Sequence, residues 1–207
     1  MSVGESVHCS ERTLAALAQP AYSRLPVDER RRRLLELGAD LFATHSYEEI
    51  SMAQIAREAG ISKALLYHYF PSKRELFVAT LQQSADEVAQ LTEPDPGLPA
   101  MEALAFSLDA FLGWVEEHPV AYAKLMQSSA QPEVSDLVTD IRERTAVRIL
   151  AGLAPGGAPP KLRAAVQGWL WLMDGVILDW LEHRDMERAD VCDLLLGALG
   201  GAARAAA

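Results

Sequence analysis

Apolar residues recur at intervals of three and four along most of the chain, which is the period of an amphipathic α-helix. Regularly alternating β-branched runs, which are typical of strands, are absent, and alanine and leucine dominate the composition. Proline, glycine and capping serines interrupt the pattern and divide it into separate segments. The pattern therefore predicts an all-α protein with about nine main helices.

The segments fall into two groups of different size. Short helices predominate in residues 28–76, which we expect to form a small head, whereas residues 77–207 hold longer helices and should form a larger body. Residues 1–27 are poorly specified and are expected to be either a mobile leader or an arm that packs on the body or touches a partner. The predicted helices span approximately residues 27–45, 51–59, 62–70, 72–91, 101–118, 119–128, 132–149, 161–183 and 190–203.

The most specific stretch is SMAQIAREAGISKALLYHYFPSK, residues 51–73. Ser51 is followed by Gln54 in a capping-box pattern, and Gly60 is placed to end that helix in the left-handed conformation. Ser62 caps a second short helix, which Pro71 stops. Helices of two turns are not stable alone, so the preceding helix at 27–45 is expected to cover them.

The second short helix has two different faces. Its apolar side is expected to pack on the first short helix and consists of Leu65, Leu66, Tyr69 and Phe70. Its other side is small, polar or aromatic and consists of Lys63, Ala64, Tyr67 and His68. An exposed face of this kind suits a helix in the major groove of DNA, which needs donors for phosphates and base edges and apolar atoms for thymine methyls. The alternative is a small three-helix core with no partner.

The net charge of −10 is unusual for a protein that binds nucleic acid, but it is unevenly distributed. Residues 1–80 carry ten basic and ten acidic side chains, whereas residues 81–207 carry nine and nineteen. A neutral head can still present a basic face to phosphates. The run Arg30 to Arg33 near a helix N-terminus opposes the helix dipole, so either phosphates favour it or it is a solvated face held by Asp28, Glu29 and Glu36.

This stretch closely resembles the DNA-binding domain of the tetracycline-repressor (TetR) family. The resemblance covers approximately Arg30 to Phe77 and rests on RRLLELGADLF, IAREAGIS and LYHYFPSKRELF. It implies an all-α homodimer that binds a palindromic operator in double-stranded DNA, usually as a repressor released by a small-molecule effector, here unidentified. The DNA-binding residues that it implies are Ser51, Ser62, Lys63, Ala64, Leu65, Tyr67, His68, Tyr69 and Lys73. Ser46 and Ala64 depart from the family pattern, because glycine is frequent at both positions.

Past Phe77 the resemblance is only architectural. It implies that the last two long helices form a four-helix bundle with those of a second copy. The physical pattern agrees, because a helix that is apolar nearly all round, as 161–183 is, has more than one face to bury; burial inside one monomer is the alternative. The residues expected to be divided between core and dimer interface are Trp169, Met173, Ile177, Trp180, Leu195 and Leu199.

The helices between Met101 and Leu150 are expected to surround a ligand cavity. The candidate lining residues are Phe106, Phe111, Trp114, Tyr122, Met126, Trp171 and Asp174, with ordinary core packing as the alternative for each. Asp174 is the most informative, since a carboxylate in so apolar a helix is costly if it is buried without a partner. It either faces solvent or faces the cavity, where it would favour a cationic or hydrogen-bond-donating ligand.

Other chemistry is absent from the pattern. The five histidines have no metal-ligand spacing, and the sequence lacks a nucleophile elbow, a phosphate-binding glycine loop and a dinucleotide fingerprint, so we expect no enzyme, no metal and no cofactor. Cys9 and Cys192 lie at opposite ends of the chain, and neither an apolar leader nor an uncharged run of about 18 residues is present. A cytoplasmic protein that does not bind membranes is expected. The remaining alternatives are a constitutive DNA-binding protein without a ligand and a helical carrier or enzyme with a vestigial head.

Overall fold

The computed structural model describes residues 26–128 and 132–206. Within these ranges the chain forms nine α-helices and no strand, as the sequence predicts. The helices are α1 (Val27–Thr44), α2 (Met52–Glu58), α3 (Lys63–Tyr69), α4 (Lys73–Leu91), α5 (Ala100–Glu117), α6 (Pro119–Ser128), α7 (Pro132–Leu153), α8 (Pro160–His183) and α9 (Arg188–Ala206). The expected extension at 1–27 lies almost wholly outside the described residues, as does Cys9.

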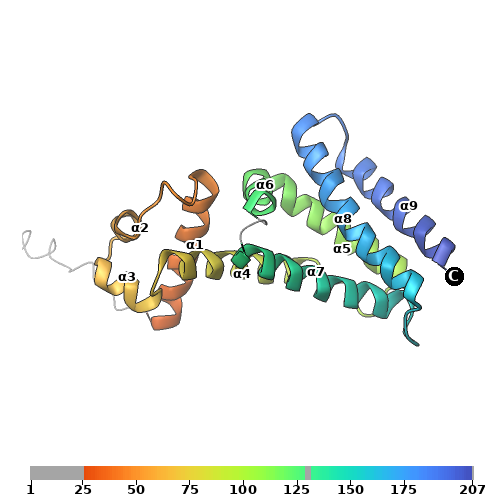
Figure 1. Ribbon diagram of the computed structural model, residues 1–207, viewed down its shortest axis with the longest axis horizontal. Helices are drawn as coiled ribbons and strands as arrows, with labels where there is room; N and C mark the ends of the chain where they lie inside the picture. The colour runs from red at the N-terminus through yellow and green to blue at the C-terminus, as the bar shows by residue number, and fades with distance from the viewer. Residues whose placement is uncertain (1–25, 129–131, 207) are drawn as a thin grey trace, which may run out of the picture.

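The molecule is elongated, with α1, α2 and α3 at one end and α8 and α9 at the other (Figure 1). Helix α4 begins beside α3 and runs toward the body, where it contacts α5 and α7. It therefore belongs to both parts: Leu76 lies in the core of the head, while the later turns of α4 face the body. The contact of α1 with α6 is a second connection between the two parts.

The head has its own apolar core beneath α2 and α3. The fully or nearly fully buried side chains of this core are Leu34, Leu35, Phe42, Ile50, Met52, Ile55, Ala56, Leu66, Phe70 and Leu76. Helices α1 and α4 pack closely at Gly38, where an added Cβ would lie 2.7 Å from Cγ2 of Thr80. Glycine is required there because the neighbouring helix occupies the place of a side chain.

The body has a separate core, which is built mainly from α5, α8 and α9. Two tryptophans of α8 are buried in it, and each satisfies its indole N–H with a backbone carbonyl: Trp169 donates to Leu195 at 2.8 Å and Trp180 donates to Met186 at 2.8 Å. These bonds fix α8 against α9 and the turn that joins them. Cys192 lies in the same core as a free thiol.

None of the described helices combines the length and the apolar character that crossing a lipid bilayer requires. Among residues 26–128 and 132–206, no three histidine, cysteine or carboxylate side chains come together as metal ligands would.

Candidate DNA-binding surface and ligand cavity

Three serines start α2, α3 and α4 in the same way. Ser51 accepts a hydrogen bond from the Gln54 N–H at 3.2 Å, Ser62 from the Leu65 N–H at 3.1 Å, and Ser72 from the Glu75 N–H at 3.1 Å. Each bond satisfies one of the backbone donors that a helix N-terminus leaves free. The starts of α2, α3 and α4 are thus fixed by local sequence.

The turn between α2 and α3 depends on Gly60. Its φ of 65° lies in the left-handed region, where an L side chain is strained. The following residue, Ile61, donates its N–H to the Ala56 carbonyl at 3.0 Å and closes the end of α2. This turn sets the direction in which α3 leaves the head.

Helix α3 divides into the two faces that the sequence predicts. Leu66 and Phe70 are buried in the head core, and Leu65 and Tyr69 are half-buried. Of the nine residues proposed to bind DNA, the exposed ones are Ser51, Ser62, Lys63, Ala64, Tyr67 and His68. No element of the described chain covers this face, which leaves it available to a groove.

The exposed side chains of α3 are arranged as a small basic and aromatic surface. The Lys63 ammonium lies 5.7 Å from the centre of the Tyr67 ring, one turn later. His68 and Tyr69 make an edge-to-face contact with ring centres 5.7 Å apart. The first of these contacts holds Lys63 near the N-terminal end of α3, where base edges are usually contacted.

Lys73 differs from the expectation. Its ammonium turns inward, donates to the carbonyls of Tyr47 at 2.7 Å and Ile50 at 2.9 Å, and lies 4.2 Å from the centre of the Tyr47 ring. In this structure it ties α4 to the loop before α2, so its charge is not directed at a phosphate. No local pattern indicates this contact, because it joins residues that are 23 and 26 positions apart in the chain.

Two arginines of the run Arg30 to Arg33 form a solvated face with neighbouring glutamates, which is one of the two alternatives for this run. Arg32 pairs with Glu29 at 2.9 Å and with Glu36, and Arg33 pairs with Glu29 at 3.0 Å. The hydrogen bonds from these two guanidinium groups lower the pKa of Glu29. Arg31 instead lies over the Phe70 ring at 5.3 Å.

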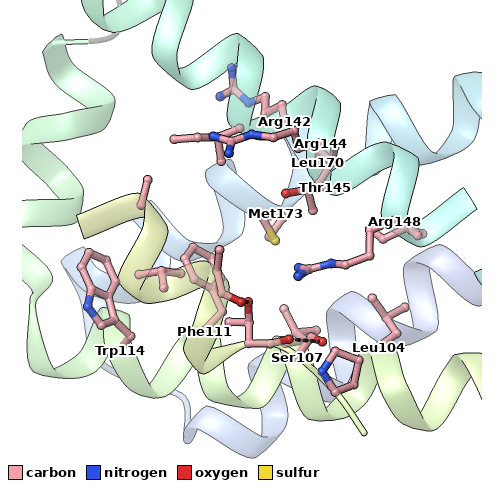
Figure 2. A pocket seen from close by; sticks show the side chains of 18 of the residues that line it. Leu104, Ser107, Phe111, Trp114, Arg142, Arg144, Thr145, Arg148, Leu170 and Met173 are labelled. Carbon is pink, nitrogen blue, oxygen red and sulfur yellow. Dashed lines mark hydrogen bonds between the residues drawn. The ribbon is translucent and has the colours of Figure 1, made fainter. Parts of the chain in front are cut away.

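The body contains a cavity of about 650 Å3. It lies between α4, α5, α6, α7 and α8, and its lining is mostly apolar. Figure 2 shows Phe111 and Trp114 on one side of it and Leu170 and Met173 on another. A cavity of this size and character is typical of a site for a small organic ligand.

Five of the seven residues proposed for the cavity lie in its lining: Phe111, Trp114, Tyr122, Met126 and Asp174. Phe106 and Trp171 do not, and this corrects the expectation for both. Phe106 is 48% exposed on α5, and Trp171 is 64% exposed on α8, where its ring stacks on the Arg142 guanidinium 4.0 Å away. Both lie on a turn that also bears lining residues, but their side chains leave the helix in another direction.

Asp174 is half-buried and has partners on two sides. Tyr122 donates its hydroxyl to one carboxylate oxygen at 2.9 Å. Arg142 donates to the other through Nε at 3.2 Å and also through Nη2. Burial, together with the neighbouring Asp174 charge, raises the pKa of Tyr122 well above its ordinary value. The carboxylate therefore faces the cavity, but an arginine of α7 already neutralises it.

Arg148 and Thr145 are lining residues that sequence reasoning missed. Both come from α7, one turn apart, and Figure 2 shows the Arg148 guanidinium pointing toward the middle of the cavity. Neither side chain has a hydrogen bond or ion pair to another residue of the described ranges. A signal was present in the sequence, since Arg144, Thr145 and Arg148 interrupt the apolar stripe of α7 at helical spacing.

The six residues that were expected to be divided between core and dimer interface lie in the core or the cavity lining of the monomer. Trp169, Ile177, Trp180, Leu195 and Leu199 are all buried in the monomer core, and Met173 faces the cavity, so none presents a surface to a second copy. The small and apolar residues that α8 and α9 leave exposed include Ala164, Gly168, Trp171, Leu172, Gly175, Leu194 and Gly197. The exposed apolar residues recur at helical spacing, but they lie on a different face of each helix from the residues that were named.

Two family profiles match the chain. One described as bacterial regulatory proteins of the tetR family matches residues 34–80. Another, described as a tetracyclin repressor-like C-terminal domain, matches residues 100–199. The first match covers the head core and α3, and the second covers most of the cavity and the two last helices.

Individual proteins give the same result. The chain is 32% identical over 121 residues to the HTH-type transcriptional activator FasR of Mycolicibacterium smegmatis, a match that covers 55% of this chain and about half, 53%, of that relative. It is 24% identical over 176 residues to the HTH-type transcriptional repressor KstR of Rhodococcus jostii, covering 82% and 81% of the two chains. A crystal structure of a tetR-family transcriptional regulator from Streptomyces coelicolor superposes with a TM-score of 0.75 at 29% identity, covering 88% and 90%.

A capped helix pair with an exposed second helix, a cavity-bearing helical body and the two matching profiles lead to one conclusion. The chain belongs to the TetR family and is a DNA-binding transcriptional regulator, not an enzyme.

Proposed function

We propose that this regulator acts as a homodimer on a palindromic operator, and that a small molecule bound in the body cavity releases it from DNA. The observation that carries the proposal is the structure of α3. Leu66 and Phe70 on its apolar side are buried in the head core. Lys63, Ala64, Tyr67 and His68 form a polar and aromatic face that nothing in the described chain covers. Two such faces, one helical turn of DNA apart, would read two half-sites.

Uncovered glycines on α8 and α9 support the homodimer. Gly168, Gly175 and Gly197 lie in helix interiors, and a Cβ added at any of them would meet nothing within 4 Å. Glycine in such a position costs about 1 kcal/mol of helix stability relative to alanine, and packing within the monomer gives no reason for it. Close approach of the same helices from a second copy would give one, and exposed Leu172 and Leu194 would supply apolar contact.

The connections between cavity and head support control by a ligand. Helices α4 and α6 line the cavity, and both also contact α1 of the head. A ligand that binds one arrangement of these helices more tightly than another will shift the population of DNA-competent heads. The named relatives include an activator and a repressor; we infer repression, with release on ligand binding.

The test is sequence-selective DNA binding. Genomic footprinting would supply the operator, and a shift assay across salt would then measure its affinity, which should fall steeply as salt rises. Lys63→Ala and Tyr67→Ala should each weaken binding, whereas Val147→Ala, on the exposed side of α7, should not. Absence of sequence-selective binding at moderate salt would refute the proposal. Operator binding that no small molecule weakens would favour a constitutive regulator instead.

A further inference from the structure

The polar groups of the cavity lining are of two kinds. In the first kind, the polar groups bond to one another: Tyr122 donates to one carboxylate oxygen of Asp174 and Arg142 donates to the other. Arg142 is also stacked on the Trp171 ring, 4.0 Å away. Because this carboxylate already has a cation and a hydroxyl donor, it gives a cationic ligand little that is new. The expectation that Asp174 selects a cation is therefore not supported by its surroundings.

The other group is open. The Arg148 guanidinium extends over the apolar lining toward Met173, and Leu104 lies below it in the view of Figure 2. Thr145 presents its hydroxyl from the preceding turn of the same helix face. Neither has a partner in the part of the chain that the structure describes, so five guanidinium N–H donors and one hydroxyl are available side by side.

The remaining charges on the lining do not cancel Arg148. Arg144 is paired with Asp140 at 2.9 Å on the outer side of α7. Asp95, in the loop after α4, is exposed and accepts a hydrogen bond from the Gly97 N–H at 2.8 Å. The uncompensated charge that points into the cavity is therefore positive.

Away from Arg148, most of the lining consists of aliphatic and aromatic side chains from five helices. It has room for an extended apolar group, since the cavity measures about 650 Å3. A ligand that matches both the apolar lining and the positive charge of Arg148 needs a long apolar body and one anionic end. A planar carboxylate would also match the two parallel donors of a guanidinium.

We propose that the cavity binds an amphipathic anion, with its apolar chain between α4, α5, α7 and α8 and its anionic head group on Arg148 and Thr145. The inference rests on the proposed function in taking this cavity as the effector site, and it adds the chemical class of the effector. The shared chemistry is an anionic oxygen group on a long apolar chain, from either a carboxylate or a phosphate ester.

The experiment measures ligand binding to the full chain without DNA. Tryptophan fluorescence is a suitable signal because Trp114 and Trp169 lie in the lining. The probes are straight-chain carboxylates of increasing length, with the alcohol, the trimethylammonium compound and the alkyl phosphate of matched length. Affinity of the carboxylates should rise about fourfold for each methylene until the cavity is full. The alcohol should bind on the order of tenfold or more weakly than the carboxylate, because it lacks the charged bond to Arg148.

Two variants assign the head-group site. Arg148→Met should abolish the preference for the carboxylate over the alcohol while the dependence on chain length remains, which would show that the cavity is still folded. Arg144→Met, which removes a charge from the same helix outside the cavity interior, is the matched control and should keep the preference. If the trimethylammonium compound binds as tightly as the carboxylate, or if Arg148→Met retains the preference, the inference is wrong.

Further comparisons identify the head group of the anion. They also test the ligand class separately from the proposed function. An alkyl phosphate that binds more tightly than the carboxylate, and loses this advantage in Arg148→Met, would identify a phosphate head group. Anion binding that depends on Arg148 but leaves operator affinity unchanged would uphold the ligand class and refute ligand control of DNA binding. Release of the operator by a small molecule that is not an anion would uphold the proposed function and refute this inference.

Discussion

The Lys124 ammonium, on α6 of the body, lies 2.8 Å from the carbonyl oxygen of Ala43 at the end of α1 in the head. It also donates to the carbonyls of His45 at 3.0 Å and Phe42 at 3.4 Å. The last carbonyls of a helix have no partner within the helix and carry partial negative charge. A side chain of the body therefore caps a helix of the head, and Tyr122, two residues earlier on α6, lines the cavity.

This contact predicts a specific effect of Lys124→Met. Removal of the cap should lower the free energy of unfolding by about 1 kcal/mol, because the ammonium is only half-buried. Amide hydrogen exchange should become faster in the last turn of α1, and the difference between liganded and free operator affinity should shrink. Gln127→Met, on the exposed side of α6, is the control. Unchanged exchange in α1 together with a full ligand response would show that α6 does not transmit the signal through Lys124.

Tyr122 predicts the behaviour of the protein at high pH. Burial raises its pKa above the ordinary value of about 10, so the folded state favours the neutral phenol more than the unfolded state does. Stability from this group is thus fully present below about pH 10 and is lost as pH rises above that value. Phenolate absorbance should show one tyrosine that does not ionise until the protein unfolds.

Tyr122→Phe provides the comparison for that titration. The variant should lose the late-ionising phenol, and its free energy of unfolding should fall less between neutral and alkaline pH than that of the wild type. Tyr67→Phe, at an exposed position, is the control and should leave the late phase in place. A wild-type protein in which all tyrosines ionise together while it remains folded would contradict the burial of this phenol.

Substitution of Lys63 is predicted to weaken operator binding, whereas substitution of Lys73 is predicted to lower stability. Lys63→Ala should weaken operator binding and reduce the salt slope by about one contact, with little effect on stability, because the side chain is exposed. Lys73→Met should lower the free energy of unfolding of the head by about 1–2 kcal/mol, because it removes two bonds to carbonyls. Urea unfolding and a shift assay across salt measure the two effects. A stable Lys73→Met protein with a reduced salt slope would instead restore Lys73 as a phosphate contact.

The helix ends of the head were predictable because the chain encodes them locally. A capping serine accepts from an amide three residues later, and Gly60 and Pro71 stop helices through their own backbone geometry. These features need no knowledge of distant residues. The two faces of α3 were also predictable, since a seven-residue helix has few ways to bury its large apolar side chains.

The body was predicted less well, because the same apolar period serves core, cavity and exposed surface. Trp169 and Trp180 satisfy their indole N–H groups inside the monomer, which a sequence pattern cannot distinguish from an interface position. Lys124 donates to carbonyls about 80 residues away in the chain. The role proposed for Arg148 depends on the apolar residues of other helices that line the cavity with it. Such tertiary relationships carry the proposed coupling and ligand class.

Gly38 provides a test of the α1 and α4 packing. Gly38→Ala gains up to about 1 kcal/mol of helix propensity but places a methyl 2.7 Å from Cγ2 of the buried Thr80. Overpacking of this kind costs about 1–3 kcal/mol, so the net effect should be a lower urea midpoint. Thr80→Ser in the same chain should recover stability, because it removes the methyl and keeps the hydroxyl that donates to Phe77 at 2.7 Å. If Gly38→Ala is as stable as the wild type, the two helices are farther apart than described.

The proposed dimer face predicts the effect of a charge at Leu172 on α8. Leu172 is 46% exposed in the monomer, and Gly168 and Gly175 flank it on the same side of the helix. Leu172→Arg should leave the free energy of unfolding of the monomer nearly unchanged, while an arginine without a partner inside an interface would be strongly unfavourable. Sedimentation should therefore show monomers where the wild type forms dimers. Operator affinity should fall with the loss of the second head. Val147→Arg, at a 67% exposed position on α7, should remain dimeric. A dimeric Leu172→Arg protein would place the contact between copies on another surface.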